Sequence, residues 1–248
     1  HRLPYFYEGI IQADQDYADP ARDVTVTVEL TSAGGQRHEV EAFWDGGRIW
    51  RFRFSAPEPG QWSFRVCPSD DSEDSWLGGT GDFFVRPYAG PNPLCRHGSL
   101  QVSENGTHLV HADGTPFFWL ADTAWNGVLK ADVADWNRYL SMRREQGFTA
   151  IQCVLTDWRA FPANAKGERA FDGVSDIQIN PDFFRELDEK VAAISAQGLV
   201  PVLVLLWALT PRDPGHYLPE DDCIHLARYL VARYGAYRPV WFLGGDGS

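Results

Sequence analysis

The sequence has 248 residues, of which 44% are hydrophobic and 23% are charged, a balance typical of a folded globular protein. Its 34 acidic and 22 basic residues give a net charge of −12, which disfavours nucleic acids and anionic membrane surfaces as partners. The same charge leaves neutral or cationic ligands as candidates. No apolar stretch in the sequence approaches the roughly 18–20 residues of a membrane span.

The first part of the sequence, residues 1–88, has the pattern of short antiparallel strands. Apolar and polar side chains alternate with a period of two, and turn signals such as Asp45-Gly46-Gly47 recur between the runs. The predicted strands cover residues 24–30, 39–44, 49–54, 62–66 and 83–85. No helical pattern interrupts them, so we predict an immunoglobulin-like antiparallel β-sandwich for residues 1–88.

Residues 89–248 follow a linker rich in proline and glycine and alternate strands with helices. The predicted strands cover residues 116–120, 149–155, 199–206 and 239–243. The predicted helices cover residues 132–146, 181–197 and 219–234. Asn180 as N-cap, Pro181 at the first helical position and Gly198 after the end delimit the second helix.

This alternation predicts buried parallel strands, as in a doubly wound sheet or a (β/α)8 TIM barrel. No GxGxxG or GxxxxGK[ST] motif follows a strand, which favours the barrel over a nucleotide-binding fold. A complete barrel has eight units in roughly 250 residues. We therefore expect residues 89–248 to hold only about the first four β/α units, the N-terminal half of a barrel.

In a barrel the functional groups follow the carboxyl ends of the strands. The candidate residues found there are Asp122 and Trp125, Asp157 and Trp158, Trp207, and Asp246. An aspartate in such a place serves equally well as a helix N-cap, and a tryptophan there is more often a core residue than a platform for a ligand. Asp246 is the strongest candidate because Gly244 and Gly245 allow a ligand to approach closely. His216, in the loop after Trp207, fits a solvated residue better than a catalytic one.

The four cysteines, Cys67, Cys95, Cys153 and Cys223, form no CxxC pair and no cluster with histidine. This spacing argues against a zinc site, and we predict neither a metal nor a cofactor. A Cys67–Cys95 disulfide stays open, because sequence alone does not define the geometry that it needs.

Carboxylates and tryptophans without a metal cluster suit glycoside hydrolysis. That reaction needs one acid to protonate the leaving oxygen and a second carboxylate as nucleophile or base, while aromatic faces stack on sugar rings. A hypothesis from another class is a non-catalytic carbohydrate-binding or adhesion protein, because the same tryptophans bind glycans without cleaving them.

Several motifs resemble one known family. VHADGTPFFWLADTAW (110–125) resembles the opening of the barrel in the apiosidase-like glycoside hydrolases, and QGFTAIQ (146–152) is similar to that family's entry to its second strand. The loop containing Asn164 and the terminal WFLGGD (241–246) look like the family's next loop and its fourth strand end. AFWDGG (42–47) and EPGQW (58–62) look like the β-sandwich module that often precedes this barrel.

The resemblance implies a retaining (β/α)8 hydrolase that acts on an oligo- or polysaccharide of plant or microbial origin. It implies that Asp246 is the general acid/base, and it adds Asn164 to the substrate-binding candidates. The family's nucleophilic glutamate, near the end of strand seven, has no counterpart in this sequence.

The ends of the sequence suggest two further expectations. It begins with His1, and its only methionine is Met142, so we expect that it is not a raw translation start. No signal peptide is visible, yet a polysaccharide hydrolase suits an extracellular or periplasmic location. A half-barrel that dimerises through its open strand edge is a third hypothesis, and the oligomeric state stays open.

Overall fold

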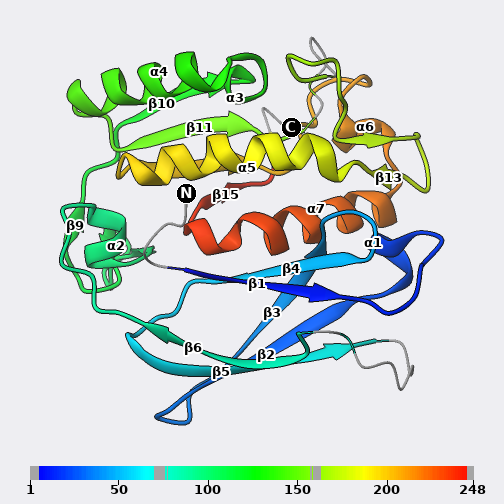
Figure 1. Ribbon diagram of the computed structural model, residues 1–248. Helices are drawn as coiled ribbons and strands as arrows, with labels where there is room; N and C mark the ends of the chain where they lie inside the picture. The colour runs from blue at the N-terminus through cyan, green and yellow to red at the C-terminus, as the bar shows by residue number, and fades with distance from the viewer. Residues whose placement is uncertain (1–5, 70–75, 77, 157, 159–162, 245–248) are drawn as a thin grey trace. The chain divides into compact units, whose positions relative to one another are not determined.

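The computed structural model describes residues 6–69, 76, 78–156, 158 and 163–244 (Figure 1). Contacts divide the chain into two compact units. One, the β unit, is made by residues 6–88 together with 228–236, and the other, the α/β unit, by residues 89–227 together with 237–244.

Between residues 6 and 88, the described part of the β unit contains six strands and one short helix. They are β1 (Tyr7–Gln12), α1 (Pro20–Asp23), β2 (Val26–Ser32), β3 (Arg37–Trp44), β4 (Ile49–Phe54), β5 (Gly60–Pro68) and β6 (Thr80–Val85). All strand pairs are antiparallel and follow the order β1-β4-β3-β2-β5-β6. The predicted antiparallel β character is confirmed, and β1 is a strand that the alternation pattern had not indicated.

The six strands form one hydrogen-bonded sheet, and this sheet curls. Tyr7 of β1 and Phe83 of β6, from the two ends of the order, stack with ring centroids 4.0 Å apart and planes 8° apart. Alternate residues of β2, including Val28 and Leu30, are fully buried in the core of this unit. The predicted sandwich of two separate sheets is thus replaced by a single curled sheet, since twisted strands bring both ends together.

The α/β unit contains nine strands and several helices in the part of the chain that the structure describes. The first elements are α2 (Pro93–His97), β7 (Leu100–Val102), β8 (Leu109–His111), β9 (Pro116–Phe117), β10 (Ala121–Trp125), α3 (Gly127–Lys130), α4 (Val133–Glu145) and β11 (Ala150–Val154). They are followed by β12 (Phe171–Asp172), β13 (Gln178–Ile179), α5 (Pro181–Ala196), β14 (Val200–Val204), α6 (Pro214–Tyr217), α7 (Glu220–Tyr234), η1 (Gly235–Tyr237) and β15 (Val240–Phe242). Residues 228–236 of α7 and η1 belong to the β unit.

Four parallel strands organise this unit, in the order β10-β11-β14-β15. Every residue of β14 is buried, as expected for a parallel strand covered on both faces. Helices α4 and α5 lie side by side (Figure 1), where the indole N–H of Trp136 donates to the Lys190 carbonyl at 2.9 Å. The predicted parallel α/β region is therefore confirmed.

Local signals define the helix ends as predicted. The Asn180 side chain caps α5 by accepting from the amide of Asp182, and Asp132 caps α4 in the same way through Asp135.

All four cysteines are free thiols, so no Cys67–Cys95 disulfide forms, and burial raises the pKa of the Cys153 thiol to about 12. Among the described residues, no helix combines the length and apolarity needed to cross a bilayer.

A close contact in the β unit generates a stability prediction. Gly9 lies opposite Phe52 in the β1–β4 register, and a Cβ at residue 9 would lie 2.1 Å from Cε1 of that ring. Because Phe52 is fully buried and cannot move aside freely, Gly9→Ala should lower the free energy of unfolding by about 1–3 kcal/mol. Gly34→Ala is the control, since its nearest atom would lie 3.6 Å away, and equal denaturation midpoints for the two variants would contradict the prediction.

Candidate functional site

Three tryptophans meet at the carboxyl edge of the parallel sheet. Trp125 is the last residue of β10, Trp158 follows β11, and Trp207 follows β14. Trp125 and Trp158 stack with centroids 5.6 Å apart and planes 4° apart, and Trp207 meets Trp125 edge-on at 4.9 Å and 88°. The structure therefore brings together all three predicted tryptophans, which we call the tryptophan cluster.

Trp125 adopts an unusual backbone conformation. The β10–β11 register shifts between Thr123 and Trp125, and Trp125 has a φ of +48°, in the left-handed region. A non-glycine residue held in such a region costs on the order of 1–3 kcal/mol, and strain of this kind concentrates at functional sites. The Trp125 side chain is 36% exposed, so the strain serves to present an aromatic ring to solvent.

Trp207 provides the buried part of the cluster. It is only 3% exposed and packs with Val154 and Val204 at the ends of their strands. Its loop is closed by the fully buried Asp213, whose Oδ2 accepts hydrogen bonds from the amides of Leu209 and Thr210 at 3.1 and 2.5 Å. The Trp207 carbonyl also accepts from the Gly215 amide at 2.9 Å, so the loop holds this ring in place.

At this edge the indole nitrogen of Trp207 is buried and has no hydrogen-bond partner among the described residues, and the same holds for the hydroxyl of Thr156, which is fully buried just beyond β11. Buried polar groups are nearly always paired, so such exceptions leave room for a partner from outside the chain, a water molecule or a ligand. Thr156 was not singled out from sequence, although a hydroxyl directly after an apolar strand was a visible signal.

Asp122 does not lie where the sequence predicted. It is the second residue of β10, opposite Ile151, and not a residue beyond the strand end. Its Oδ2 accepts from the Tyr139 hydroxyl at 2.8 Å and from Nε of Arg143, both on α4. Partial burial alone would raise the pKa of Asp122, but the hydrogen bonds from Arg143 and Tyr139 outweigh it and hold that pKa below its usual value. Asp122 thus fastens α4 to β10.

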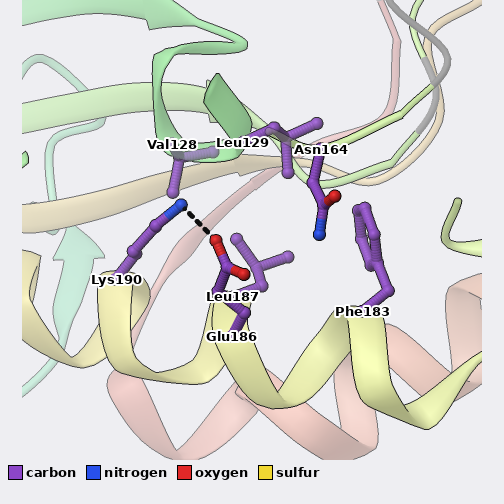
Figure 2. Close-up of a pocket in the computed structure, with 7 residues that line it drawn as sticks. All are labelled: Val128, Leu129, Asn164, Phe183, Glu186, Leu187 and Lys190. Carbon is purple, nitrogen blue, oxygen red and sulfur yellow. Dashed lines mark hydrogen bonds and ion pairs between the residues drawn. The ribbon is translucent and has the colours of Figure 1, made fainter. Parts of the chain in front are cut away.

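Asn164 lies in a different place from the tryptophans. It lines a narrow crevice, and none of the cluster residues contributes to the lining (Figure 2). Its Nδ2 donates to Glu168 at 2.8 Å, and its Oδ1 accepts from the amides of Lys166 and Glu168, each at 2.9 Å. The side-chain amide of Asn164 is therefore engaged in hydrogen bonds within its own loop. The structure does not bring Asn164 to the tryptophan cluster.

Two predicted site residues, Asp157 and Asp246, lie outside the described residues. Gly244, the last described residue before Asp246, follows β15, whose neighbour in the sheet is β14. His216 is exposed in the short helix α6, as expected for a solvated residue.

The role of Asp122 generates a pH prediction. Asp122→Asn should lower the free energy of unfolding by about 1–2 kcal/mol near neutral pH, because a charge-assisted hydrogen bond is lost. The folded-state pKa is depressed, so the stabilisation is present above the ordinary aspartate pKa of about 3.9 and is lost as pH falls through the folded value. The difference between the proteins should therefore shrink in urea titrations at acidic pH. Asp182→Asn, which removes an exposed helix pair with Arg185, is the control, and a pH-independent difference would contradict the assignment.

The unpaired indole of Trp207 generates a second prediction. Trp207→Phe and Trp136→Phe remove the same volume from buried sites, but only Trp136 has a partner for its N–H among the described residues. Trp136→Phe should therefore be the less stable variant by about 0.5–1.5 kcal/mol, because it loses the hydrogen bond from the indole N–H to the Lys190 carbonyl. Chemical denaturation measures both, and equal losses would show that the Trp207 N–H is satisfied in the unliganded protein.

Comparison with known proteins places these features in a family. A model of the apiosidase-like catalytic domain matches residues 103–248, and a model of a domain of unknown function (DUF5060) matches residues 6–68. No curated protein matches the chain significantly.

Solved structures share the fold. A protein from Bacteroides vulgatus ATCC 8482 to which a glycoside hydrolase function has been attributed has a TM-score of 0.77 and 20% identity, over 98% of this chain and 49% of that chain. A protein described as a glycoside hydrolase has a TM-score of 0.55 and 26% identity, over 63% of this chain and 36% of its own. A family 5 glycoside hydrolase from the same Bacteroides strain has a TM-score of 0.55 and 24% identity, over 63% and 34%.

This chain thus spans about half the length of the first of these proteins and about a third of the other two. Since the catalytic-domain model matches more than half of the sequence, from residue 103 to residue 248, the chain belongs to the apiosidase-like family.

Proposed function

We propose that this chain supplies the first four β/α units of a (β/α)8 barrel that hydrolyses O-glycosidic bonds in a plant or microbial oligo- or polysaccharide. Family membership supports this proposal, and so does the likeness to a glycoside hydrolase at 26% identity. The four parallel strands in sequential order, β10-β11-β14-β15, are the pattern with which such a barrel begins.

The observation that carries the proposal is the tryptophan cluster. Its three rings come from three neighbouring strands and lie at the carboxyl edge of the sheet, where barrel enzymes place their sites. Indole faces provide broad, rigid apolar surfaces beside a polar N–H. A sugar ring has an apolar face and a rim of hydroxyl groups, and so matches both parts.

For the chemistry we propose Asp246 as general acid/base, from its position directly after the fourth strand. In a retaining mechanism it protonates the leaving oxygen while a second carboxylate, about 5–5.5 Å away, attacks the anomeric carbon; the same residue then activates the water that releases the sugar. We place that nucleophile outside this chain. Asp157 stays a substrate-binding candidate, and export to the periplasm or the cell exterior suits a polymeric substrate.

The alternative is a non-catalytic carbohydrate-binding protein. The tryptophan cluster favours sugar binding whether or not hydrolysis follows, so this alternative rests on the same observation. The binding protein differs from the enzyme in one respect: the carboxylate of Asp246 would then have no effect on the rate of glycoside hydrolysis.

The test uses the protein that joins this chain to the rest of its barrel. Asp246→Asn should lower kcat for release of reducing sugar from plant cell-wall polysaccharides by about 10²–10⁴-fold, the usual size of a general acid/base contribution. Trp125→Ala should instead raise KM about two- to tenfold, since an aromatic contact of this kind contributes roughly 0.5–1.5 kcal/mol.

The matched control is Phe84→Ala, which removes an aromatic ring that is 61% exposed in the β unit. It should leave both constants unchanged. Turnover of Asp246→Asn near that of the wild type would remove this residue from the mechanism. Retention on a polysaccharide without release of sugar would support the binding protein over the enzyme.

A further inference from the structure

The turn between β7 and β8 contains an asparagine followed by a glycine, at residues 105 and 106. Backbone hydrogen bonds close this turn: the Ser103 amide donates to the His108 carbonyl at 2.9 Å, and the Gly106 amide donates to the Ser103 carbonyl at 2.8 Å. Residues 104–108 are exposed, so water reaches the turn. Asparagine followed by glycine is a common pair in tight turns, and the fold alone accounts for its presence here.

The side chain of Asn105 has contacts that the turn itself does not require. Its oxygen accepts three hydrogen bonds, from the Ser103 hydroxyl at 2.9 Å, the Thr107 hydroxyl at 2.8 Å and the Thr107 amide at 3.2 Å. A backbone amide can only donate, so the atom that it reaches is the carbonyl oxygen Oδ1. Within the part of the chain that the structure describes, Nδ2 of Asn105 has no hydrogen-bond partner. Three donors therefore converge on the side-chain carbonyl, and none of them involves its nitrogen.

His108 supports both hydroxyl donors. Its Nδ1 lies 3.1 Å from the Thr107 hydroxyl oxygen, and its backbone amide donates to the Ser103 hydroxyl at 3.2 Å. The Thr107 hydroxyl has one hydrogen and gives it to Asn105, so the imidazole Nδ1–H donates to Thr107. Hydrogen bonds in a chain polarise one another, and the imidazole thus strengthens the donation of Thr107 to Asn105.

We propose that Asn105 is a site of self-modification, at which the protein converts its own asparagine into aspartate and isoaspartate. The backbone nitrogen of Gly106 attacks Cγ of Asn105, and a bond forms between these atoms as the bond from Cγ to Nδ2 breaks. The proton of the Gly106 amide leaves with Nδ2 as ammonia, and a five-membered succinimide ring remains. One water molecule then opens the ring at either carbonyl. The reaction needs water and no other reactant.

The three donors act on the first step of this reaction. The attack turns Oδ1 into an oxyanion, and donors already directed at that atom stabilise the charge as it develops. Gly106 has no Cβ to hinder the approach of its nitrogen. The hydrogen bond from Gly106 to the Ser103 carbonyl opposes the attack, but a bond in an exposed turn opens at a small free-energy cost. The turn therefore favours the reaction more than it hinders it.

The product differs from the original turn in charge and in backbone length. Each conversion adds one negative charge, and isoaspartate also inserts a methylene group into the backbone between β7 and β8. Ammonia is lost to solvent, so the conversion is irreversible. The fraction of converted molecules thus records the age of the protein, whatever reaction the protein catalyses.

A second asparagine–glycine pair in the chain serves as an internal control. Asn126 precedes Gly127, the first residue of α3, and its side chain makes no capping hydrogen bond. Asn126 is half-buried, and no donor among the described residues reaches its side-chain oxygen. The two pairs share one dipeptide sequence and differ in the donors around it. Because trypsin cleaves after Arg96 and Lys130, both pairs lie in the single tryptic peptide 97–130.

The measurement is tandem mass spectrometry of that peptide after the folded full chain has stood in mildly alkaline water enriched in a heavy oxygen isotope. The label enters only where a succinimide has opened. Asn105 should react about tenfold faster than Asn126, the factor expected from one hydrogen bond to a developing charge. Thr107→Val removes the hydroxyl donor and should slow Asn105 by about the same factor, with Asn126 unchanged. Thr107→Ser keeps the hydroxyl and should react like the wild type.

The same proteins in denaturant separate the fold from the local sequence. With the turn lost, Asn105 should react at one rate in the wild type, Thr107→Val and Thr107→Ser. Slowing by Thr107→Val that persists in denaturant would overturn the proposal, because the residue type and not the folded contact would then be responsible.

Two results in the folded protein would also overturn it. Faster reaction of Asn105 in Thr107→Val would show that the donors protect the amide, and equal rates at Asn105 and Asn126 would show that they have no effect. Thr107 is exposed, so both variants are expected to fold, and circular dichroism checks this. None of these rates depends on cleavage of a polysaccharide, so this proposal and the proposed function fail separately.

Discussion

The parallel pairing of four strands is the constraint on which the site depends. Because β10, β11, β14 and β15 all run in one direction, whatever follows each strand is delivered to the same edge of the sheet. Residues 125, 158 and 207 are far apart in sequence and still form one aromatic group. The helices between the strands supply the buried apolar faces that make this pairing stable, with α4 and α5 joined through Trp136.

Polar contacts outside the aromatic group define its surroundings. Asp213 closes the loop that carries Trp207, Asp122 fastens α4 to the strand that ends in Trp125, and Glu186 of α5 pairs with Lys166 in the loop of residues 163–168. Each of these carboxylates accepts from donors on a different element or along its own loop. These three acidic residues near the site thus have structural roles, whereas the role proposed for Asp246 is chemical.

Much of this architecture is encoded locally, and that part was predictable. The cap at Asn180, the proline after it and the alternation in β2 depend on neighbours in sequence, so the three long helices and most strands were found, whereas the short helices α1, α2, α3 and α6 were not. The placement of Asp122 was wrong because the apolar residues 117–120 resembled a buried strand. In the structure Phe118 is 74% exposed, and the paired strand begins only at Ala121, opposite Ala150.

The hydrogen-bond partners of Asp122 lie about twenty residues further along the chain on α4, and no sequence pattern near Asp122 indicates them. Strand β1 was not predicted for a similar reason, because its pairing with β4 defines it as a strand. The aromatic group was predictable as a set because each tryptophan follows a strand. Its geometry was not, because ring orientation depends on contacts among three separate loops.

The left-handed conformation of Trp125 bears on the thermodynamics of ligand binding. A side chain already held between two other rings has few rotamers left to lose, so a ligand that stacks on it meets a small entropic penalty. The strained backbone of Trp125 is already present in the folded protein, where it lowers the free energy of unfolding and adds no cost to ligand binding. For the sugar ligand proposed above, the larger cost of association should accordingly be the removal of water from its hydroxyl groups, and ordering of the protein should contribute less.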